Sequence, residues 1–411
     1  MKTISCLWES NRGDFVFLKW IISILIYLSV FFLNLTIRLD HLRFFYVVTV
    51  ITAGIGIFLG IFIIVKKRQK RERNMYRQPL PLSKFSVLLS TVFKNEGQTI
   101  INTLRHYLTF SHKIDIVFYD DQSDDGSYEE LKKWQKNGSD HITIKTLTKS
   151  QKILHPKGMG FEDMVTQYDS DYYCIIDADT IIEEATLEKA LNMMEKEDIR
   201  VLHFTRRNDL SNDIANNIAD TEELFSTVNK VIGIFPWYFN GSGFIMKGDV
   251  ASMMAYDEYS PSDDCQISYF LRKKGIKVYD ALSLFAHEKA PSTIVKFLKQ
   301  HSSWTKGGIH HYIEKERFTI FFPAFISAYF LFSLINPAGI YNIFLPLAFI
   351  FIWSTDFIAN VVVAKRSFKL SFRNALLHTL SLFYKGMVTV PYHIFTFPFK
   401  RFSFWFTKTR Y

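Results

Sequence analysis

Residues 172–179 read Tyr-Tyr-Cys-Ile-Ile-Asp-Ala-Asp, an apolar run that ends in two carboxylates one residue apart. Such a run is typical of a buried β-strand, in which side chains at i and i+2 point to the same side. The pattern therefore predicts that Asp177 and Asp179 lie side by side at the end of a strand. Two neighbouring carboxylates repel each other unless a cation offsets their charge, so the pair suits a divalent ion that phosphate oxygens also hold. An ordinary acidic turn gives the same short pattern, so the rest of the chain has to decide between the two.

The middle of the chain, from about residue 83 to about residue 315, alternates short β-rich runs with helical patterns. This alternation favours an α/β fold with a mostly parallel sheet and helices on both faces. The first expected elements are a strand at 85–89, a helix at 99–108, a strand at 114–119 and a helix that begins at Ser127.

An acidic loop follows the second expected strand, where residues 120–127 read Asp-Asp-Gln-Ser-Asp-Asp-Gly-Ser. Ligands of open α/β sheets bind beyond the carboxyl ends of the strands. We therefore expect Asp120 and Asp121 to face the same crevice as Asp177 and Asp179. The last residues of the loop also suit turn and helix-capping roles. Four aspartates in six residues exceed what one cap requires.

The two ends of the chain are more apolar than its middle. Residues 17–37 contain one charged side chain, Lys19, and residues 44–65 contain none. Each run reaches the roughly 20 residues needed to cross a bilayer, which predicts an N-terminal helical hairpin. The basic stretch at 66–73 favours a cytoplasmic location for the domain that follows. Because this stretch comes directly after an apolar run, the net charge of +9 indicates contact with anionic lipid rather than with nucleic acid.

A second apolar block covers residues 318–364 and predicts another pair of spans. Residues 375–399 are apolar but contain charges and prolines, which favours an interfacial or re-entrant arrangement. Three cysteines without regular spacing indicate neither a disulfide framework nor a zinc site. We therefore expect a multi-pass protein of the cell membrane in three parts. These are an N-terminal membrane hairpin with its basic linker (1–78), an α/β domain in the cytoplasm (79–316), and C-terminal membrane and interfacial helices (317–411).

Several motifs follow one another in a fixed order along the chain. They are Asn95-Glu96, the acidic loop, Lys157-Gly158, Asp177-Ala178-Asp179, Asn240-Gly241-Ser242-Gly243-Phe244, Ser262-Asp263-Asp264, Leu271-Arg272-Lys273-Lys274-Gly275 and Gln300-His301-Ser302-Ser303-Trp304. This order resembles the family 2 glycosyltransferases. The flanking apolar blocks resemble their membrane-embedded branch, which includes hyaluronan, chitin, cellulose and poly-N-acetylglucosamine synthases and ceramide glucosyltransferase. The resemblance covers about residues 83–308 and implies a GT-A-like fold with a nucleotide-sugar-binding half.

The resemblance implies roles for the residues of that half. Asp177 and Asp179 would hold Mg2+ or Mn2+, with Asp179 as the direct ligand, and the ion would act as a Lewis acid on the diphosphate. Asp120 and Asp121 would contact the uridine base and the ribose of a UDP-sugar. Lys157 occupies the position of a basic residue near the nucleotide, and an exposed loop lysine is the alternative.

The resemblance also implies a catalytic base. Asp264 aligns with the aspartate of the family's Glu-Asp pair, which deprotonates the acceptor hydroxyl opposite the leaving group, so that the anomeric centre is inverted. Asp263 replaces the usual glutamate and keeps its charge. The alternative for both is capping of a helix expected at 266–274. The glycine-rich residues 240–243 suit a close backbone approach to a sugar, or an ordinary tight turn.

The family's Gln-x-x-Arg-Trp element also has a counterpart. Gln300 and Trp304 are four residues apart, on one face of a helix, where the indole can form an apolar platform for an acceptor sugar. A core or membrane-interface tryptophan is the alternative. Ser303 replaces the family's arginine, which weakens the case for long-chain processive synthesis. His287 follows an expected strand, where a structural histidine and a metal ligand are the two interpretations.

These features together predict a membrane-integral, metal-dependent, inverting glycosyltransferase. Its expected partners are a UDP-sugar donor, a glycan or lipid acceptor and the lipid bilayer, and not nucleic acid. The expected product is a β-linked polysaccharide or oligosaccharide. Two alternatives stay open, namely transfer of a single sugar to a sphingolipid or polyprenyl phosphate, and a non-enzymatic transporter or receptor.

Overall fold

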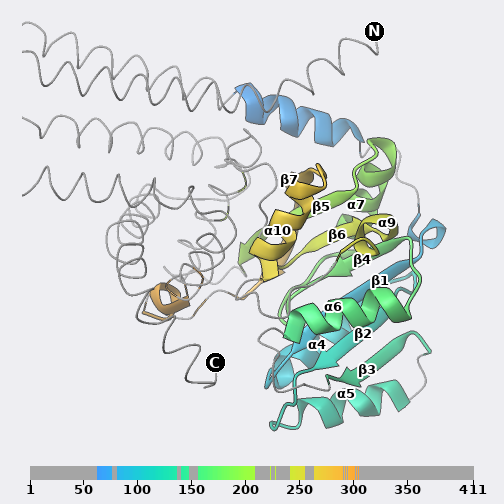
Figure 1. Ribbon diagram of the computed structural model, residues 1–411, viewed down its shortest axis with the longest axis vertical. Coiled ribbons are helices and arrows are strands. Elements are labelled where there is room, and N and C mark those ends of the chain that lie inside the picture. Colours follow the sequence, from blue (N-terminus) through green and yellow to red (C-terminus); the bar gives the residue numbers. More distant parts are fainter. Residues whose placement is uncertain are drawn as a thin grey trace, which may run out of the picture.

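The computed structural model describes most of the central domain (Figure 1). The described residues are 63–75, 81–136, 140–147, 156–208, 223, 227, 241–254, 263–289, 291, 293, 295–300, 302 and 304. The expected N-terminal spans, apart from residues 63–65, and the whole C-terminal part lie outside them. Among the described helices, none is both long and apolar enough to cross a membrane.

Strands and helices alternate along the described chain. In chain order they are η1 (Leu82–Lys84), β1 (Val87–Phe93), α4 (Gln98–Leu108), β2 (Asp115–Asp120), α5 (Ser127–Lys136), β3 (Ile142–Thr146), α6 (Pro156–Gln167), β4 (Tyr172–Ile175), α7 (Glu184–Lys196), β5 (Val201–Asn208), β6 (Phe244–Lys247), α9 (Gly248–Ala251), α10 (Asp263–Lys273) and β7 (Val278–Glu288). Residues 63–75, which precede η1, are also helical.

The strands form one seven-stranded sheet in the order β3-β2-β1-β4-β6-β5-β7. The pairs β1 with β2, β1 with β4, β2 with β3 and β5 with β7 are parallel. Only β6 runs against its neighbours β4 and β5 among these described strands. The predicted α/β sheet is therefore confirmed, with one reversed strand. The start of β6 and the carboxyl ends of the other strands share one edge of the sheet, and the site described below lies at this edge.

Helices cover both faces of the sheet, as predicted (Figure 1). Successive residues of β1 enter different cores, because side chains alternate along a strand. Leu89 packs with Leu104 of α4 in a core that also includes residues of α5 and α7. Leu88 packs with Met164 of α6 in a second core that includes residues of α9 and α10. Two apolar layers therefore fix the sheet between its helices.

The first strand is longer and later than the sequence predicts. It begins at Val87 and ends at Phe93, whereas the apolar pattern placed it at 85–89. Ser90 and Thr91 interrupt the apolar run, but both are buried because β1 lies between β2 and β4. A central strand thus continues through polar residues that a pattern of apolar side chains does not include.

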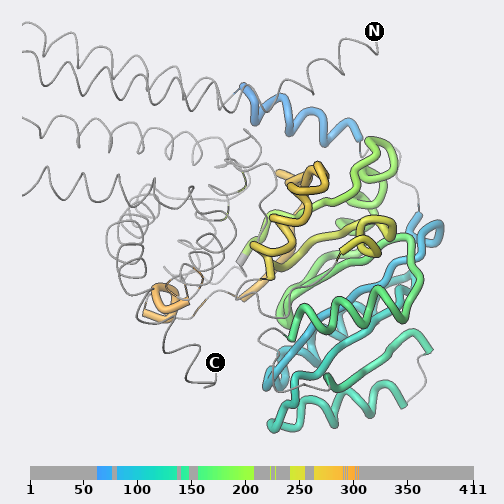
Figure 2. The backbone as a smooth tube through the Cα atoms, in the orientation of Figure 1, coloured from blue at the N-terminus to red at the C-terminus, as the bar shows by residue number. Residues whose placement is uncertain are grey.

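The helix over residues 63–75 lies beside β7 (Figure 2). Its Glu72 side chain is fully buried and accepts hydrogen bonds from the backbone N–H of Leu282, at 3.0 Å, and from the Ser283 hydroxyl. These two residues directly follow Ala281, where the pairing of β7 with β5 shifts register. The carboxylate therefore accepts hydrogen bonds from polar groups in an irregular part of β7, where the regular pairing with β5 is interrupted.

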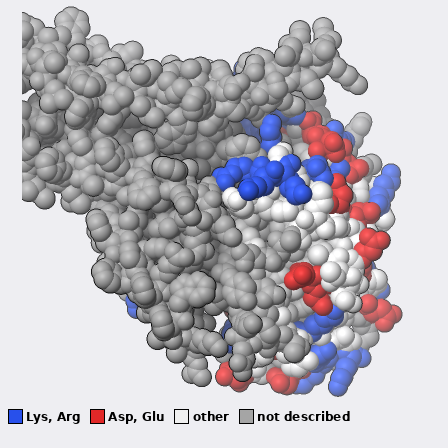
Figure 3. All heavy atoms as spheres, viewed as in Figure 1, with Lys and Arg blue, Asp and Glu red and all other residues white. Residues whose placement is uncertain are grey.

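Basic side chains gather near the end of α10 (Figure 3). The exposed residues there are Arg272, Lys273, Lys274 and Lys277. The positive charge of the chain is therefore not confined to the stretch at 66–73 that follows the first apolar block.

Candidate active site

Asp177 and Asp179 follow the end of β4, where the sequence pattern places them, and the backbone there forms a turn rather than extended strand. β4 ends at Ile175, and the backbone N–H of Thr180 donates to the carbonyl of Asp177 at 3.0 Å. A turn does not place side chains i and i+2 on one side as a strand does. The strand still delivers the turn to the predicted edge of the sheet, because the carboxyl ends of β1, β2 and β4 meet there.

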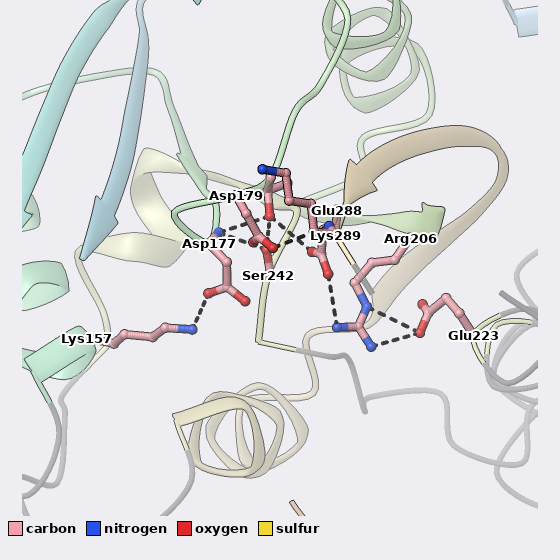
Figure 4. Close-up of polar contacts among 9 residues, drawn as sticks. Lys157, Asp177, Asp179, Arg206, Glu223, Ser242, Glu288 and Lys289 are labelled. Carbon is pink, nitrogen blue, oxygen red and sulfur yellow. Dashed lines mark hydrogen bonds and ion pairs between the residues drawn. The ribbon is translucent and has the colours of Figure 1, made fainter. Parts of the chain in front are cut away.

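The two carboxylates point to different partners (Figure 4). Asp177 forms an ion pair with Lys157, and Oδ2 of Asp179 accepts from the backbone N–H of Lys289 at 3.3 Å. They still interact, because burial and then the charge of Asp177 raise the pKa of Asp179. Burial and the charges of the same two aspartates also raise the pKa of Glu96. The turn is thus a place where negative charge accumulates, as a cation-binding site requires.

Lys157 connects this turn to the start of α10. It is the second residue of α6, whose first residue, Pro156, suits a helix start because its missing N–H is not needed there. The Lys157 ammonium lies 3.7 Å from Oδ2 of Asp263 while it contacts Asp177. Burial disfavours the charged form, but the charges of Asp177, Asp263 and Asp264 outweigh it and raise the lysine's pKa. Lys157 therefore lies among the predicted site aspartates, and its contact with a nucleotide stays a prediction.

Asp263 and Asp264 occupy the first turn of α10, which begins three residues earlier than predicted. Acidic residues stabilise a helix start, so the structural role that the sequence allowed is present. Gly241 lies directly beside them, since a Cβ atom on it would be 3.4 Å from Oδ2 of Asp263 and from Cβ of Asp264. A side chain at Gly241 would therefore crowd the two aspartates, and the approach of this segment to a sugar stays a prediction.

Asp120 and Asp121 lie at the same edge of the sheet, at the end of β2. Both are buried, and Oδ1 of Asp120 accepts from the backbone N–H of Ser123, three residues on, at 3.0 Å. Lys94 lies 3.7 Å from Asp121. The turn role that the sequence allowed for the last residues of the loop is seen at Asp125, whose Oδ1 accepts from the backbone N–H of Ser127 at 3.0 Å. Contact with a uridine or ribose stays a prediction for Asp120 and Asp121.

The end of β7 contacts the aspartate turn, which local sequence patterns did not indicate. His287 and Ile181 exchange two backbone hydrogen bonds of 2.7 Å each. The next residue, Glu288, accepts through Oε1 from the Thr180 hydroxyl at 3.0 Å (Figure 4). Ser242 lies 2.8 Å from Thr180 through its Oγ atom and accepts from the backbone N–H of Asp177 at 2.8 Å. A chain of polar contacts therefore joins β7 to the turn.

Arg206 of β5 closes this network on the other side. Its guanidinium lies 3.4 Å from Glu288 and 3.1 Å from Glu223 (Figure 4). Burial opposes the charged form of Arg206, but the charges of these two carboxylates outweigh it. The pKa of Arg206 is therefore raised above its ordinary value. The pKa of Glu288 is raised to about 7, mainly by burial. The charge of Arg206 lowers this pKa, and the charges of Asp177 and Asp179 raise it.

Trp304 and Gln300, the predicted acceptor-side residues, are both helical. The Trp304 ring is 46% exposed, and its centroid lies 5.5 Å from Cζ of Arg206, within the range of a cation–π contact. The structure thus connects Trp304 to the network around Glu288, while Gln300 is exposed. Ser303 lies outside the described residues.

One group of three possible metal ligands with closely spaced ligand atoms occurs in the part of the chain that the structure describes, and it does not include Asp177 or Asp179. Ligand atoms of His112, Glu184 and Glu188 lie within 4.8 Å of one another. Glu184 already accepts hydrogen bonds from the backbone N–H groups of Ser111 and His112, which accounts for the grouping without an ion. His287, read from the sequence as structural or as a metal ligand, is not part of this group, and its backbone serves the pairing with Ile181.

Residues 173–405 match glycosyl transferase family group 2, and the chain belongs to this family. The matched region begins in β4 and includes Asp177, Asp179, Asp263 and Asp264. The chain is therefore a glycosyltransferase by family. No curated protein sequence shows a significant match to the chain.

Solved structures with similarity to the chain include the mannosyltransferase PcManGT from Pyrobaculum calidifontis in complex with GDP-Man and Mn2+. Its identity is 14% and its TM-score 0.48, over 84% of this chain and 96% of that one. Another is S. aureus TarS 1-349 in complex with UDP-GlcNAc, with 12% identity and a TM-score of 0.39 over 70% of this chain and 93% of that one.

Proposed function

We propose that the chain is a metal-dependent, inverting glycosyltransferase of the cell membrane. In this proposal it transfers a sugar from a UDP-sugar to a growing β-linked polysaccharide or oligosaccharide. Membership of the family supports sugar transfer itself. The observation that carries the rest is that Lys157 lies between Asp177 and Asp263, so that the aspartate turn and the start of α10 belong to one site.

The donor side of the proposal rests on the turn after β4. Carboxylate oxygens are hard ligands of the kind that Mg2+ and Mn2+ take together with substrate phosphates. The raised pKa of Asp179, caused by burial and by Asp177, fits a site in which a cation offsets accumulated negative charge. Asp177 and Asp179 would hold the ion, which neutralises charge on the leaving diphosphate. Lys157 adds a positive charge that a diphosphate could share, and Asp120 and Asp121 are the proposed contacts of the uridine and ribose.

The acceptor side of the proposal rests on the first turn of α10. Asp264 is the proposed general base, because an inverting transfer needs a carboxylate on the face of the sugar opposite the leaving group. Asp263, which lies 3.7 Å from the Lys157 ammonium, would remain paired with it. Gln300 and Trp304 are the proposed contacts of the acceptor, and Trp304 is sufficiently exposed to stack against a sugar ring.

The experiment that tests this function uses the full chain in lipid with a panel of radiolabelled UDP- and GDP-sugars and Mn2+. We expect UDP release from one UDP-sugar that requires the metal and that falls about 100-fold or more in Asp264→Asn. Asp198→Asn is the matched control, since that side chain is 88% exposed and lies outside the site. Turnover that survives in Asp264→Asn would remove the assigned base.

The same reactions distinguish the classes of acceptor. A radiolabelled product that stays in the aqueous phase and grows in size supports the polysaccharide or oligosaccharide. A product that extracts into organic solvent with one sugar per lipid supports transfer to a sphingolipid or polyprenyl phosphate. Absence of turnover with every donor, in folded protein, would overturn the assignment of a nucleotide-sugar donor.

A further inference from the structure

The last two residues of β7 and the residue that follows it contact three consecutive residues of the aspartate turn. His287 pairs through its backbone with Ile181, Glu288 accepts from Thr180, and the backbone of Lys289 donates to Asp179. Antiparallel order relates the two segments, since 287, 288 and 289 meet 181, 180 and 179. Figure 4 shows Glu288 and Lys289 beside Asp177, Asp179 and Ser242. The turn is therefore hydrogen-bonded to a distant part of the chain, since Thr180 and Glu288 are 108 residues apart in sequence.

The inner part of this network links the backbone of Asp177 to Glu288 through two hydroxyl groups. The Asp177 N–H donates to Ser242, so that Ser242 must direct its own proton elsewhere, toward Thr180 or Glu288. Thr180 donates to Glu288, which leaves its oxygen free to accept. Glu288 accepts the Thr180 hydrogen bond through Oε1 and forms the end of this series of contacts.

The network lies in the interior of the protein. Thr180 and Ser242 are 0% and 1% exposed, and water has little access to replace a lost hydrogen bond between them. The Glu288 side chain is 12% exposed and pairs with Arg206, which Glu223 holds in turn. A buried polar network that is fully satisfied keeps a unique arrangement, whereas loss of one member leaves the others without partners.

We propose that Glu288 is a positioning residue for the metal-binding turn. Through Thr180 and Ser242 it holds the backbone of Asp177 in the conformation that presents Asp177 and Asp179 to the cation and the donor diphosphate. Glu288 itself does not contact the cation or the sugar in this account. The inference rests on the proposed function, because it assumes that the turn binds a divalent ion. Supports of this kind commonly change metal affinity by about 10- to 100-fold when they are removed.

The test compares variants of nearly constant shape in the full chain. Thr180→Val removes the hydroxyl at the middle of the network, and Thr180→Ser keeps it. Glu288→Gln removes the charge and introduces an N–H donor. The measurement is isothermal titration calorimetry of Mn2+ into each protein in the presence of UDP, with thermal unfolding as the check on folding.

We expect Thr180→Val and Glu288→Gln each to weaken Mn2+ binding about 10- to 100-fold, and Thr180→Ser to bind as the wild type does. The double variant Thr180→Val with Glu288→Gln should bind no more weakly than the worse single variant, because both interrupt one network. A purely structural role would lower the unfolding temperature and leave the affinity of the folded protein for Mn2+ unchanged, which would overturn the inference.

The two proposals fail in different ways in this experiment. If the wild type binds Mn2+ with UDP and the valine and glutamine variants bind equally well, the positioning role is wrong and the proposed function stands. If the wild type itself binds no Mn2+ in the presence of UDP, the metal site is wrong and the positioning role falls with it.

Discussion

The side chain of Lys157 forms an ion pair with Asp177, one of the two carboxylates proposed to hold the metal. The lysine ammonium therefore competes with a divalent ion for Asp177 until a diphosphate offers it other oxygens. We predict that Lys157→Met binds Mn2+ alone up to about fivefold more tightly, since a partly exposed ion pair contributes up to about 1 kcal/mol.

The same variant should show a higher KM for the donor, because a positive charge near the diphosphate is lost. Calorimetry with Mn2+ alone and steady-state kinetics with the nucleotide sugar measure the two effects separately. Lys133→Met, at a lysine that is 68% exposed, serves as the control. Weaker Mn2+ binding in Lys157→Met would show that the lysine supports the ion rather than competes with it.

Gly243 should be more sensitive to substitution than Gly275, although their φ angles are +68° and +67°. A Cβ atom on Gly243 would lie 3.1 Å from Cβ of Ala286, whereas one on Gly275 would have no neighbour within 4 Å. We predict that both alanine variants lose about 1 to 3 kcal/mol because of the backbone conformation, and that Gly243→Ala loses more because of the close contact. Denaturant unfolding of the two variants measures the difference, and equal losses would mean that the contact relaxes at no cost.

Glu72 should make the stability of the domain depend on pH. Burial raises its pKa above the ordinary value of 4.5, although hydrogen bonds from Ser283 and Leu282 and the charge of Arg68 act in the opposite direction. The folded state therefore keeps the proton at pH values where the unfolded state has lost it. This contribution to stability is complete below about pH 4.5 and is lost as the pH rises through the folded-state pKa.

Glu72→Gln removes this titration and can still accept a hydrogen bond from the Leu282 N–H. We expect the free energy of unfolding of the variant to fall less than that of the wild type as the pH rises above about 4.5. Urea unfolding of the full chain at several pH values checks the slope. Parallel curves for the two proteins would mean that Glu72 titrates alike in the folded and unfolded states.

Trp304 should affect the acceptor rather than the donor. Its ring is partly exposed and contacts Arg206, which places it beside the network that supports the aspartate turn. We predict that Trp304→Ala raises the KM for the acceptor about 5- to 150-fold, as loss of an aromatic platform worth about 1 to 3 kcal/mol requires, while Trp304→Phe retains most of the affinity. Kinetics at saturating donor separate the two substrates, and an effect confined to the donor KM would contradict the assignment.

Elements with regular local patterns were predictable from the sequence. The helix expected at 99–108 is α4 (Gln98–Leu108), the strand expected at 114–119 is β2 (Asp115–Asp120), and α5 begins at Ser127 as expected. In these segments the periodicity of apolar side chains and the turn residues at their ends agree with the tertiary structure. The reversed direction of β6 was not predictable in this way, because strand direction follows from how the chain crosses the sheet and not from the residues of the strand.

The residues of the site were predictable where a short motif carries them. Asp177, Asp263 and Lys157 are brought together as their motifs implied. Thr180, Arg206 and the side-chain role of Glu288 were not recognised, because their contacts join segments far apart in sequence and no local pattern marks them. Ionic and hydrogen-bonding partners of this kind become visible only when the sheet brings the ends of its strands together.

The central claim is that Asp177 and Asp179 bind the metal that holds the donor diphosphate. The most direct measurement is the anomalous scattering of Mn2+ in crystals of the protein grown with UDP. We predict one strong anomalous peak in contact with the carboxylate of Asp179 and with the diphosphate, and loss of this peak in Asp179→Asn. A peak at another place, or bound UDP without Mn2+ beside Asp179, would contradict the account.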